Sequence, residues 1–244
     1  MICALVLAAG RSRRMGTQKL LLPIPVPSTG SKNDALPSSG GADVSPSSSC
    51  GTDISLSSSS DTGVSPVASQ DQHRHVKPMI AHIIDQVLTS PVEHVLVVVG
   101  ADPRVPAALA DRPLTLVANP EPEGDMLSSV RCGLRALPDG CDAVLVVLGD
   151  QPTVNPEVIA EMIRTFHETA HSIVVPVWQG TRGHPLLFSA AYREEILSDH
   201  DAVGLRGLLH AHPDQIHELD AADPAVLSDV DLPEDYEREV GSGQ

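Results

Sequence analysis

Aromatic and basic residues are both scarce in this chain of 244 residues. None of its five aromatic residues precedes Phe166, so an N-terminal core must be built from Leu, Val, Ile and Ala, and stacking on nucleic-acid bases is not expected there. The chain has 16 Lys and Arg against 32 Asp and Glu, a formal net charge of −16. Because such a charge repels a phosphodiester backbone, the composition argues against a nucleic-acid partner.

Long apolar runs and paired cysteines are missing as well. No window reaches the roughly 18 apolar residues of a membrane span, and the start, MICALVLAAG, lacks the basic n-region of a signal peptide. Cys3, Cys50, Cys132 and Cys141 form no CxxC pair, which argues against a zinc site and favours reduced, mostly buried thiols. We therefore expect a cytoplasmic protein with no membrane partner.

A serine-rich segment interrupts the sequence from Val26 to Val76. Serine occupies 15 of these 51 positions, and the segment shows no hydrophobic periodicity. It cannot bury enough apolar area to offset the entropy lost on ordering, so we expect a disordered insertion at residues 26–76. The remainder is long enough to bury one core, and we expect a single domain over residues 1–244 that the insertion interrupts.

Short aliphatic runs alternate with helical patterns outside the insertion. Runs typical of buried strands cover residues 2–8, 94–100, 114–119, 143–150 and 172–178, and helical patterns cover residues 78–90, 125–137 and 156–169. This alternation predicts an α/β fold, a three-layer, mostly parallel central sheet with helices on both faces. Ligands bind at the carboxyl ends of the strands in such sheets, so the polar residues that follow the strands are expected to meet there.

A glycine and a cluster of cations follow the first predicted strand. Gly10 ends the aliphatic run, and Arg11, Arg13, Arg14 and Lys19 follow it closely. A glycine there lets backbone N–H groups approach an anion, and the cations can neutralise the roughly four charges of a triphosphate. The stretch contains neither GxxxxGK[ST] nor GxGxxG, and a solvated surface turn is the alternative interpretation.

Carboxylates follow the later strands. Asp150, in GDQP, is suited to Mg²⁺, which prefers oxygen ligands and bridges to substrate phosphates; alternatively it starts the turn before Pro152. Asp229 and Asp231, in DVDLPED, can lie on one side of an extended segment. The alternative for this pair is a helix N-cap before Pro233.

Five ordered motifs together resemble a known family. LAAGRSRRMGTQKLLLP, NPEPEGDMLSSVRCGL, LGDQP, RGHPLLF and DVDLPEDY are similar to motifs of the MobA-like nucleotidyltransferases, most closely the molybdenum cofactor cytidylyltransferases. The resemblance covers essentially everything except residues 26–76 and implies a Rossmann-like nucleotidyltransferase fold. It also implies Mg²⁺-dependent transfer of CMP from CTP to the terminal phosphate of molybdenum cofactor with release of pyrophosphate, and a molybdoenzyme that receives the product.

The resemblance assigns roles to residues motif by motif. The catalytic group it implies is Lys19, Arg14 and Asp150, with Lys19 nearest the α-phosphate. The residues implied to contact the nucleotide are Leu7, Ala8, Ala9, Gly10, Arg11, Lys19, Asn119, Gly124 and Ser128. The acceptor-side turn it implies is Gly183, His184 and Pro185. The metal ligands it implies are Asp150 and Asp231.

Other nucleotides and other functions remain as alternatives to a cytidylyltransferase. Ala9 stands where guanylyl-transferring relatives tend to have a second glycine, which favours CTP and leaves GTP or another nucleotide as the alternative. A carrier of molybdenum cofactor and an NAD(P)H oxidoreductase on the same fold are alternatives of another class. HETAH, from His167 to His171, matches the HExxH pattern of zinc proteases, with Glu194 and Glu195 downstream.

The insertion generates a prediction of its own. A long flexible loop costs little in closure entropy, which grows only logarithmically with length, so residues 28–74 are expected to be dispensable for catalysis. A deletion of residues 28–74 should fold, as judged by a cooperative thermal transition, and should retain turnover. A deletion variant that folds but has lost turnover would contradict the prediction.

Overall fold

The structure, a computed structural model, describes residues 1–10, 12, 15–26, 75–121 and 124–241. The chain divides into two units, Met1–Val26 with Val76–Gln244, and Pro27–His75. Apart from the backbone of His75, the second unit lies outside the described residues, so the disordered insertion at residues 26–76 and the single interrupted domain stay predictions. Among the described residues, no helix has both the length and the apolar character needed to cross a bilayer.

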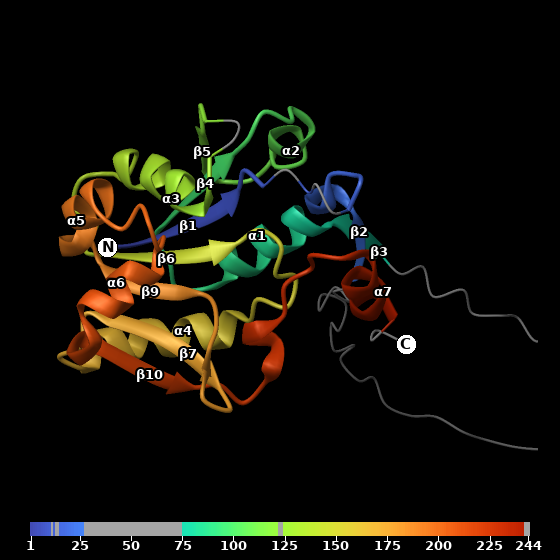
Figure 1. Ribbon diagram of the computed structural model, residues 1–244. Coiled ribbons are helices and arrows are strands. Elements are labelled where there is room, and N and C mark those ends of the chain that lie inside the picture. The colour runs from blue at the N-terminus through green and yellow to red at the C-terminus, as the bar shows by residue number, and fades with distance from the viewer. Residues whose placement is uncertain (11, 13–14, 27–74, 122–123, 242–244) are drawn as a thin grey trace, which may run out of the picture. The chain divides into compact units, whose positions relative to one another are not determined.

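A central sheet organises the first unit (Figure 1). Its strands are β1 (Ile2–Ala8), β4 (His94–Val99), β5 (Thr115–Ala118), β6 (Ala143–Leu148), β7 (Ile173–Trp178), β8 (Thr181–Arg182), β9 (Leu186–Ser189) and β10 (Ile216–Asp220). They are ordered β10-β7-β9-β6-β1-β4-β5, with β8 paired to β7. The pairs β5–β4, β4–β1, β1–β6 and β7–β10 are parallel, whereas β9 runs antiparallel to β6 and β7. The predicted mostly parallel α/β sheet is confirmed.

Helices cover both faces of the sheet. The helices are α1 (Met79–Thr89), α2 (Arg104–Ala107), α3 (Met126–Arg135), α4 (Pro156–Glu168), α5 (Arg193–Ser198), α6 (Arg206–Ala211) and α7 (Pro233–Gly241). Side chains alternate along a strand, so Ala4 and Val6 of β1 join a core with α1 and α4, while Cys3 and Leu5 join a second core with α3, α5 and α6. These two cores are the interfaces of the predicted three-layer arrangement.

Several elements differ from the pattern expected from sequence. The stretch RGHP begins at the end of β8 and leads into β9, a strand that the sequence pattern did not indicate and that pairs antiparallel with both neighbours. Strand β10 has alternating polar residues and lies at an edge, so it lacks the continuous aliphatic run of the central strands. Short helical turns also connect the elements: η1 (Lys19–Leu21), η2 (Ala190–Tyr192), η3 (Pro213–Gln215) and η4 (Pro224–Leu227).

A second sheet has two strands, one before and one after residues 27–74 in the sequence. It pairs β2 (Pro23–Val26) with β3 (His75–Pro78), so the chain comes together on the two sides of residues 27–74. The backbone N–H of Met79, the first residue of α1, donates to the carbonyl of Leu22. This contact connects the start of α1 to the segment that follows η1.

Asp85 connects α1 to the segment before β5. Its carboxylate accepts from Arg112 Nε at 2.7 Å and from Lys77 Nζ at 2.9 Å. Partial burial by itself would raise the pKa of Asp85, but the hydrogen bonds from Arg112 and Lys77 outweigh it and lower that pKa below its ordinary value of 3.8. A carboxyl group with a depressed pKa stabilises the fold above its ordinary pKa, and this contribution is lost as pH falls through the folded-state value.

The Asp85→Asn variant should therefore be less stable than wild type at pH 7, by about 1 kcal/mol in the free energy of unfolding, because the pairs are partly exposed. The difference should shrink as pH falls from 5 toward 3 and below. Urea unfolding at a series of pH values measures both quantities. A difference between the two proteins that stays constant across this range would show that the ion pairs of Asp85 do not act as described.

Candidate active site

The site lies where β1 and β6 end, and Figure 1 shows both arrowheads pointing to the same edge of the sheet. A cavity of about 270 Å³ opens there. Its walls come from the loop after β1, the first turn of α3, the end of β6 and the segment before α7. The lining residues are Leu7, Ala9, Gly10, Gly124, Asp125, Met126, Ser129, Leu148, Asp150, Asp229 and Asp231. The glycine loop and the three aspartates proposed from sequence thus share one cavity.

Lys19 joins the two aspartates that the motifs single out as metal ligands. Its Nζ lies 2.7 Å from Asp150 Oδ2 and 2.8 Å from Asp231 Oδ1, and the side chain is 9% exposed. Burial opposes the charge of this ammonium, but Asp150 and Asp231 outweigh burial and raise the pKa of Lys19 above its ordinary range. Lys19 is therefore a fixed positive charge at neutral pH.

The aspartates suit a hard divalent cation. Asp150 and Asp231 approach one ammonium from two segments, and Asp229 lines the same cavity. Within the described residues, no group of three His, Cys, Asp or Glu side chains is arranged to hold a metal by itself. Mg²⁺ is commonly bound through one or two carboxylates, with waters and substrate phosphates completing its shell, so this donor set fits Mg²⁺.

A larger cavity of about 460 Å³ adjoins the first and shares Ala9 and Gly10 with it. Ser12, Gly16, Thr17 and Gln18 form one side, and the turn from Gly100 to Arg104 forms another. Ser12 organises this loop: its Oγ accepts from Lys19 N at 2.9 Å and donates to Gln18 Oε1 at 2.8 Å. Sequence reasoning missed Ser12 and Gln18, because their role depends on a loop conformation in which Ser12 has a φ of 49°.

Asn119, Gly124 and Ser128, proposed from sequence as one nucleotide-binding group, do come together. Asn119 Nδ2 donates to Ser128 Oγ and Ser129 Oγ, each at 3.1 Å. A Cβ at Gly124 would lie 2.1 Å from Ser128 Oγ, so only glycine fits there without displacing Ser128. Asn119 lines the larger cavity and Gly124 the smaller one, whereas Ser129, which the motif did not single out, lines the smaller cavity in place of Ser128.

The expected acceptor-side turn borders a third cavity, of about 490 Å³. Gly183 and His184 line it, and it shares Asp125 and Met126 with the 270 Å³ cavity. Pro185 instead lines a separate cavity of about 240 Å³ that His184 also borders. Burial lowers the pKa of His184, against the opposing charge of Asp150, so the imidazole is neutral at pH 7.

Two groups of proposed residues stand apart from this geometry. Arg11 and Arg14, and also Arg13, lie outside the described residues, so their proposed contacts stay predictions.

The HETAH alternative lacks the helix that its two histidines would need, because α4 ends at Glu168 and His171 lies beyond the C-cap residue Thr169. The two histidines therefore do not occupy one helical face, which the zinc-protease arrangement requires.

Comparison with known proteins gives partial relatives among curated sequences. The bifunctional protein GlmU of Mycobacterium avium (strain 104) is 32% identical over 107 residues, which cover 41% of this chain and 22% of that protein. GlmU of Halorhodospira halophila is 38% identical over 88 residues, or 36% of this chain and 18% of that protein. The chain thus spans about a fifth of the length of the curated relatives it matches.

Solved structures share the fold over nearly the whole chain. The crystal structure of Rv0371c from Mycobacterium tuberculosis has a TM-score of 0.69 at 24% identity, covering 98% of this chain and 97% of that one. Its complex with manganese has a TM-score of 0.65 at 22% identity, covering 99% and 98%. Molybdopterin-guanine dinucleotide biosynthesis protein A from Archaeoglobus fulgidus has a TM-score of 0.58 at 12% identity, covering 100% and 98%. At these identities the likeness shows a nucleotidyltransferase-like fold.

A family profile settles the classification at the level of the domain. The profile described as MobA-like NTP transferase domain matches residues 72–216, more than half of the chain. The matched range includes Asn119, Gly124, Asp150 and the Gly183 turn, and the loop after β1 precedes it. The chain therefore belongs to the MobA-like NTP transferase domain family.

Proposed function

We propose that this chain is a molybdenum cofactor cytidylyltransferase, which transfers CMP from CTP to molybdenum cofactor and releases pyrophosphate. The observation that carries the proposal is the contact of Lys19 Nζ with Asp150 and Asp231, because these two aspartates line the 270 Å³ cavity that adjoins both the loop after β1 and the cavity of Gly183. Membership in the NTP transferase family supports the reaction class. A molybdoenzyme that receives the product, and a cytoplasmic location, are predictions that accompany this proposal.

The three cavities suggest where the substrates lie. The base and ribose of CTP are assigned to the 460 Å³ cavity, the phosphates to the 270 Å³ cavity and the acceptor to the 490 Å³ cavity. In this arrangement an oxygen of the acceptor phosphate attacks the α-phosphorus of CTP. The bond from that phosphorus to the oxygen bridging to the β-phosphate breaks, and pyrophosphate leaves.

The chain supplies positioning and charge for this reaction rather than a covalent intermediate. Backbone N–H groups around Gly10 and the ammonium of Lys19 would hold the phosphates, with Arg11 and Arg14 expected to assist. Asp150 and Asp231 would bind Mg²⁺, which would offset charge on the phosphates. Asp150 is held in place through its own carbonyl, which accepts from Val230 N at 2.9 Å.

Ala9 supports CTP over GTP. Ala9 lines the cavity assigned to the base, and its backbone lies so close to Gly100 that a Cβ at Gly100 would be 3.0 Å from the Ala9 carbonyl oxygen. A methyl group at position 9, where guanylyl-transferring relatives tend to have glycine, would narrow the cavity for the base and favour a pyrimidine. A difference of one methyl group in a pocket is worth about 1–3 kcal/mol, so GTP should react detectably but more slowly.

A nucleotide panel tests the proposal. CTP, GTP, ATP and UTP, each with Mg²⁺ and molybdenum cofactor, should release pyrophosphate fastest with CTP, about tenfold or more ahead of GTP. A faster reaction with GTP would make the chain a guanylyltransferase and would remove the role given to Ala9. Binding of molybdenum cofactor without pyrophosphate from any nucleotide would identify a carrier, and consumption of NAD(P)H would identify an oxidoreductase.

The Asp150→Asn variant tests the metal assignment. It should bind molybdenum cofactor normally but lose about 100-fold or more in kcat, because the metal loses an anionic ligand. Asp139→Asn, which changes an exposed aspartate in the loop before β6, is the matched control and should keep the wild-type rate. Pyrophosphate release at saturating CTP measures both variants, and a wild-type rate for Asp150→Asn would remove Asp150 from the mechanism.

A further inference from the structure

The loop between α5 and α6 forms one wall of the cavity assigned to the acceptor. Residues 201–206 all line this cavity, together with Gly183 and His184. The first five of these residues belong to turns and not to a helix or strand, and Val203 is 53% exposed. The shape of this wall therefore depends on contacts that hold the loop from outside.

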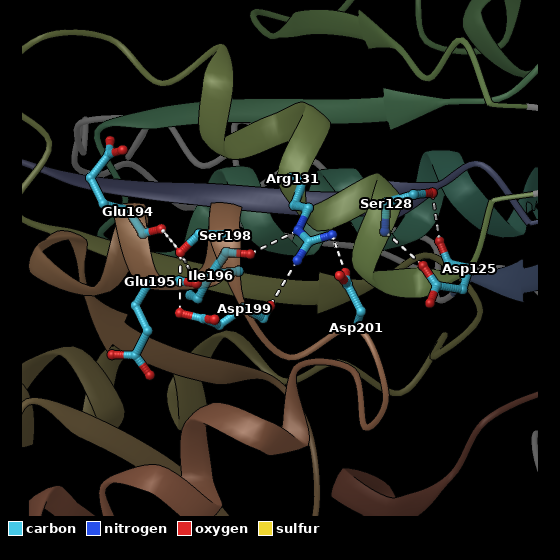
Figure 2. A network of polar contacts seen from close by, with 9 residues as sticks. All are labelled: Asp125, Ser128, Arg131, Glu194, Glu195, Ile196, Ser198, Asp199 and Asp201. Atoms are coloured by element: carbon cyan, nitrogen blue, oxygen red, sulfur yellow. Dashed lines mark hydrogen bonds and ion pairs between the residues drawn. The ribbon is translucent and has the colours of Figure 1, made fainter.

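Arg131 of α3 supplies three such contacts (Figure 2). Its Nε donates to the carbonyl of Ile196 at 2.8 Å, and its Nη2 donates to the carbonyl of Asp199 at 2.7 Å. Its Nη1 pairs with Asp201 Oδ1 at 2.5 Å. One guanidinium that is 17% exposed thus fixes the end of α5 and the start of the loop.

Glu195 contacts His200, the residue between Asp199 and Asp201. Its Oε1 lies 2.9 Å from His200 Nε2, and its Oε2 lies 2.8 Å from His212 Nε2. The His200 ring also packs against Gly207, where a Cβ would lie 2.4 Å from its Nδ1. Three consecutive residues, 199–201, are therefore held from two sides, and the loop leaves this anchor to form the cavity wall.

The helix that carries Arg131 also borders the cavities assigned to the phosphates and the acceptor. Asp125 and Met126, at its start, line both the 270 Å³ cavity and the acceptor cavity. Figure 2 shows Asp125 capping this end, where its carboxylate accepts from Ser128 N at 2.8 Å. Arg131 lies further along the same helix, so one rigid element connects the phosphate cavity to the acceptor loop.

We propose that Arg131 is a positioning residue for the acceptor, which aligns the wall of residues 201–206 with the nucleotide through α3. The inference rests on the proposed transferase function but does not depend on which nucleotide is used. Arginine is required because its planar fork donates in three directions at once, whereas a lysine ammonium at that position can keep the charge but not the three contacts.

Steady-state kinetics of Arg131→Lys and Arg131→Gln test this role, with CTP and molybdenum cofactor as the substrates. Both variants should lower kcat/KM for molybdenum cofactor by about 10- to 100-fold, the size of effect that a small misplacement of a reactant produces. The KM for CTP should stay within about twofold of wild type. Arg135→Lys, one turn further along α3 and exposed, is the matched control and should match wild type in every parameter.

Hydrogen exchange separates positioning from general damage. In Arg131→Lys, faster exchange should be confined to residues 196–206, while the melting temperature stays near that of wild type. Asp201→Asn removes the charge from one of the three contacts. It should give a smaller loss in kcat/KM for molybdenum cofactor and a smaller increase in exchange over residues 196–206, and it provides the test if the Arg131 variants fail to fold.

The outcomes distinguish this inference from the function on which it rests. Equal losses for CTP and molybdenum cofactor, or unchanged kinetics for the acceptor in an active enzyme, would overturn the role of Arg131 and leave the transferase intact. Absence of pyrophosphate from wild type with every nucleotide would overturn the transferase, and the role of Arg131 would fall with it.

Discussion

The pairing of Lys19 with two carboxylates is the interaction on which the site depends. The charge of a lysine side chain that is 9% exposed is costly to bury without partners, and Lys19 has both partners in distant parts of the chain. Asp231 is 212 positions away, in the segment before α7. Both contacts can exist together only when β1, β6 and this segment have assembled, so the site requires the folded arrangement of all three.

The close approach of α3 to β1 determines where the first turn of α3 lies relative to the site. A Cβ at Gly133 would lie 2.1 Å from Leu5 Cδ1, so glycine at this position lets the helix lie directly on the strand that leads to the glycine loop. The first turn of the same helix lies over the cavity of Asp150, and Asn119 fixes that turn through Ser128 and Ser129. Small and polar residues, more than the aliphatic core, thus determine how α3 lies against the cavity that Asp150 lines.

The sequence predicts the parts of this fold that are locally encoded. Continuous aliphatic runs mark the parallel strands β1, β4 and β6, and the residues after β1 and β6 meet as the topology of such sheets requires. Strands β9 and β10 were not predicted, because their pairing is decided by distant neighbours and one of them is a polar edge. The direction of individual side chains could not be predicted from the sequence either. The motif indicates Ser128, whereas Ser129 lines the cavity.

The arrangement of the cavities constrains the order of chemical events in the proposed reaction. Ala9 and Gly10 line both the cavity assigned to the base and the cavity assigned to the phosphates, and Asp125 and Met126 line both the latter and the cavity assigned to the acceptor. Substrates bound in adjoining spaces can react directly. Direct transfer within a complex that holds both substrates is therefore the route that this geometry favours.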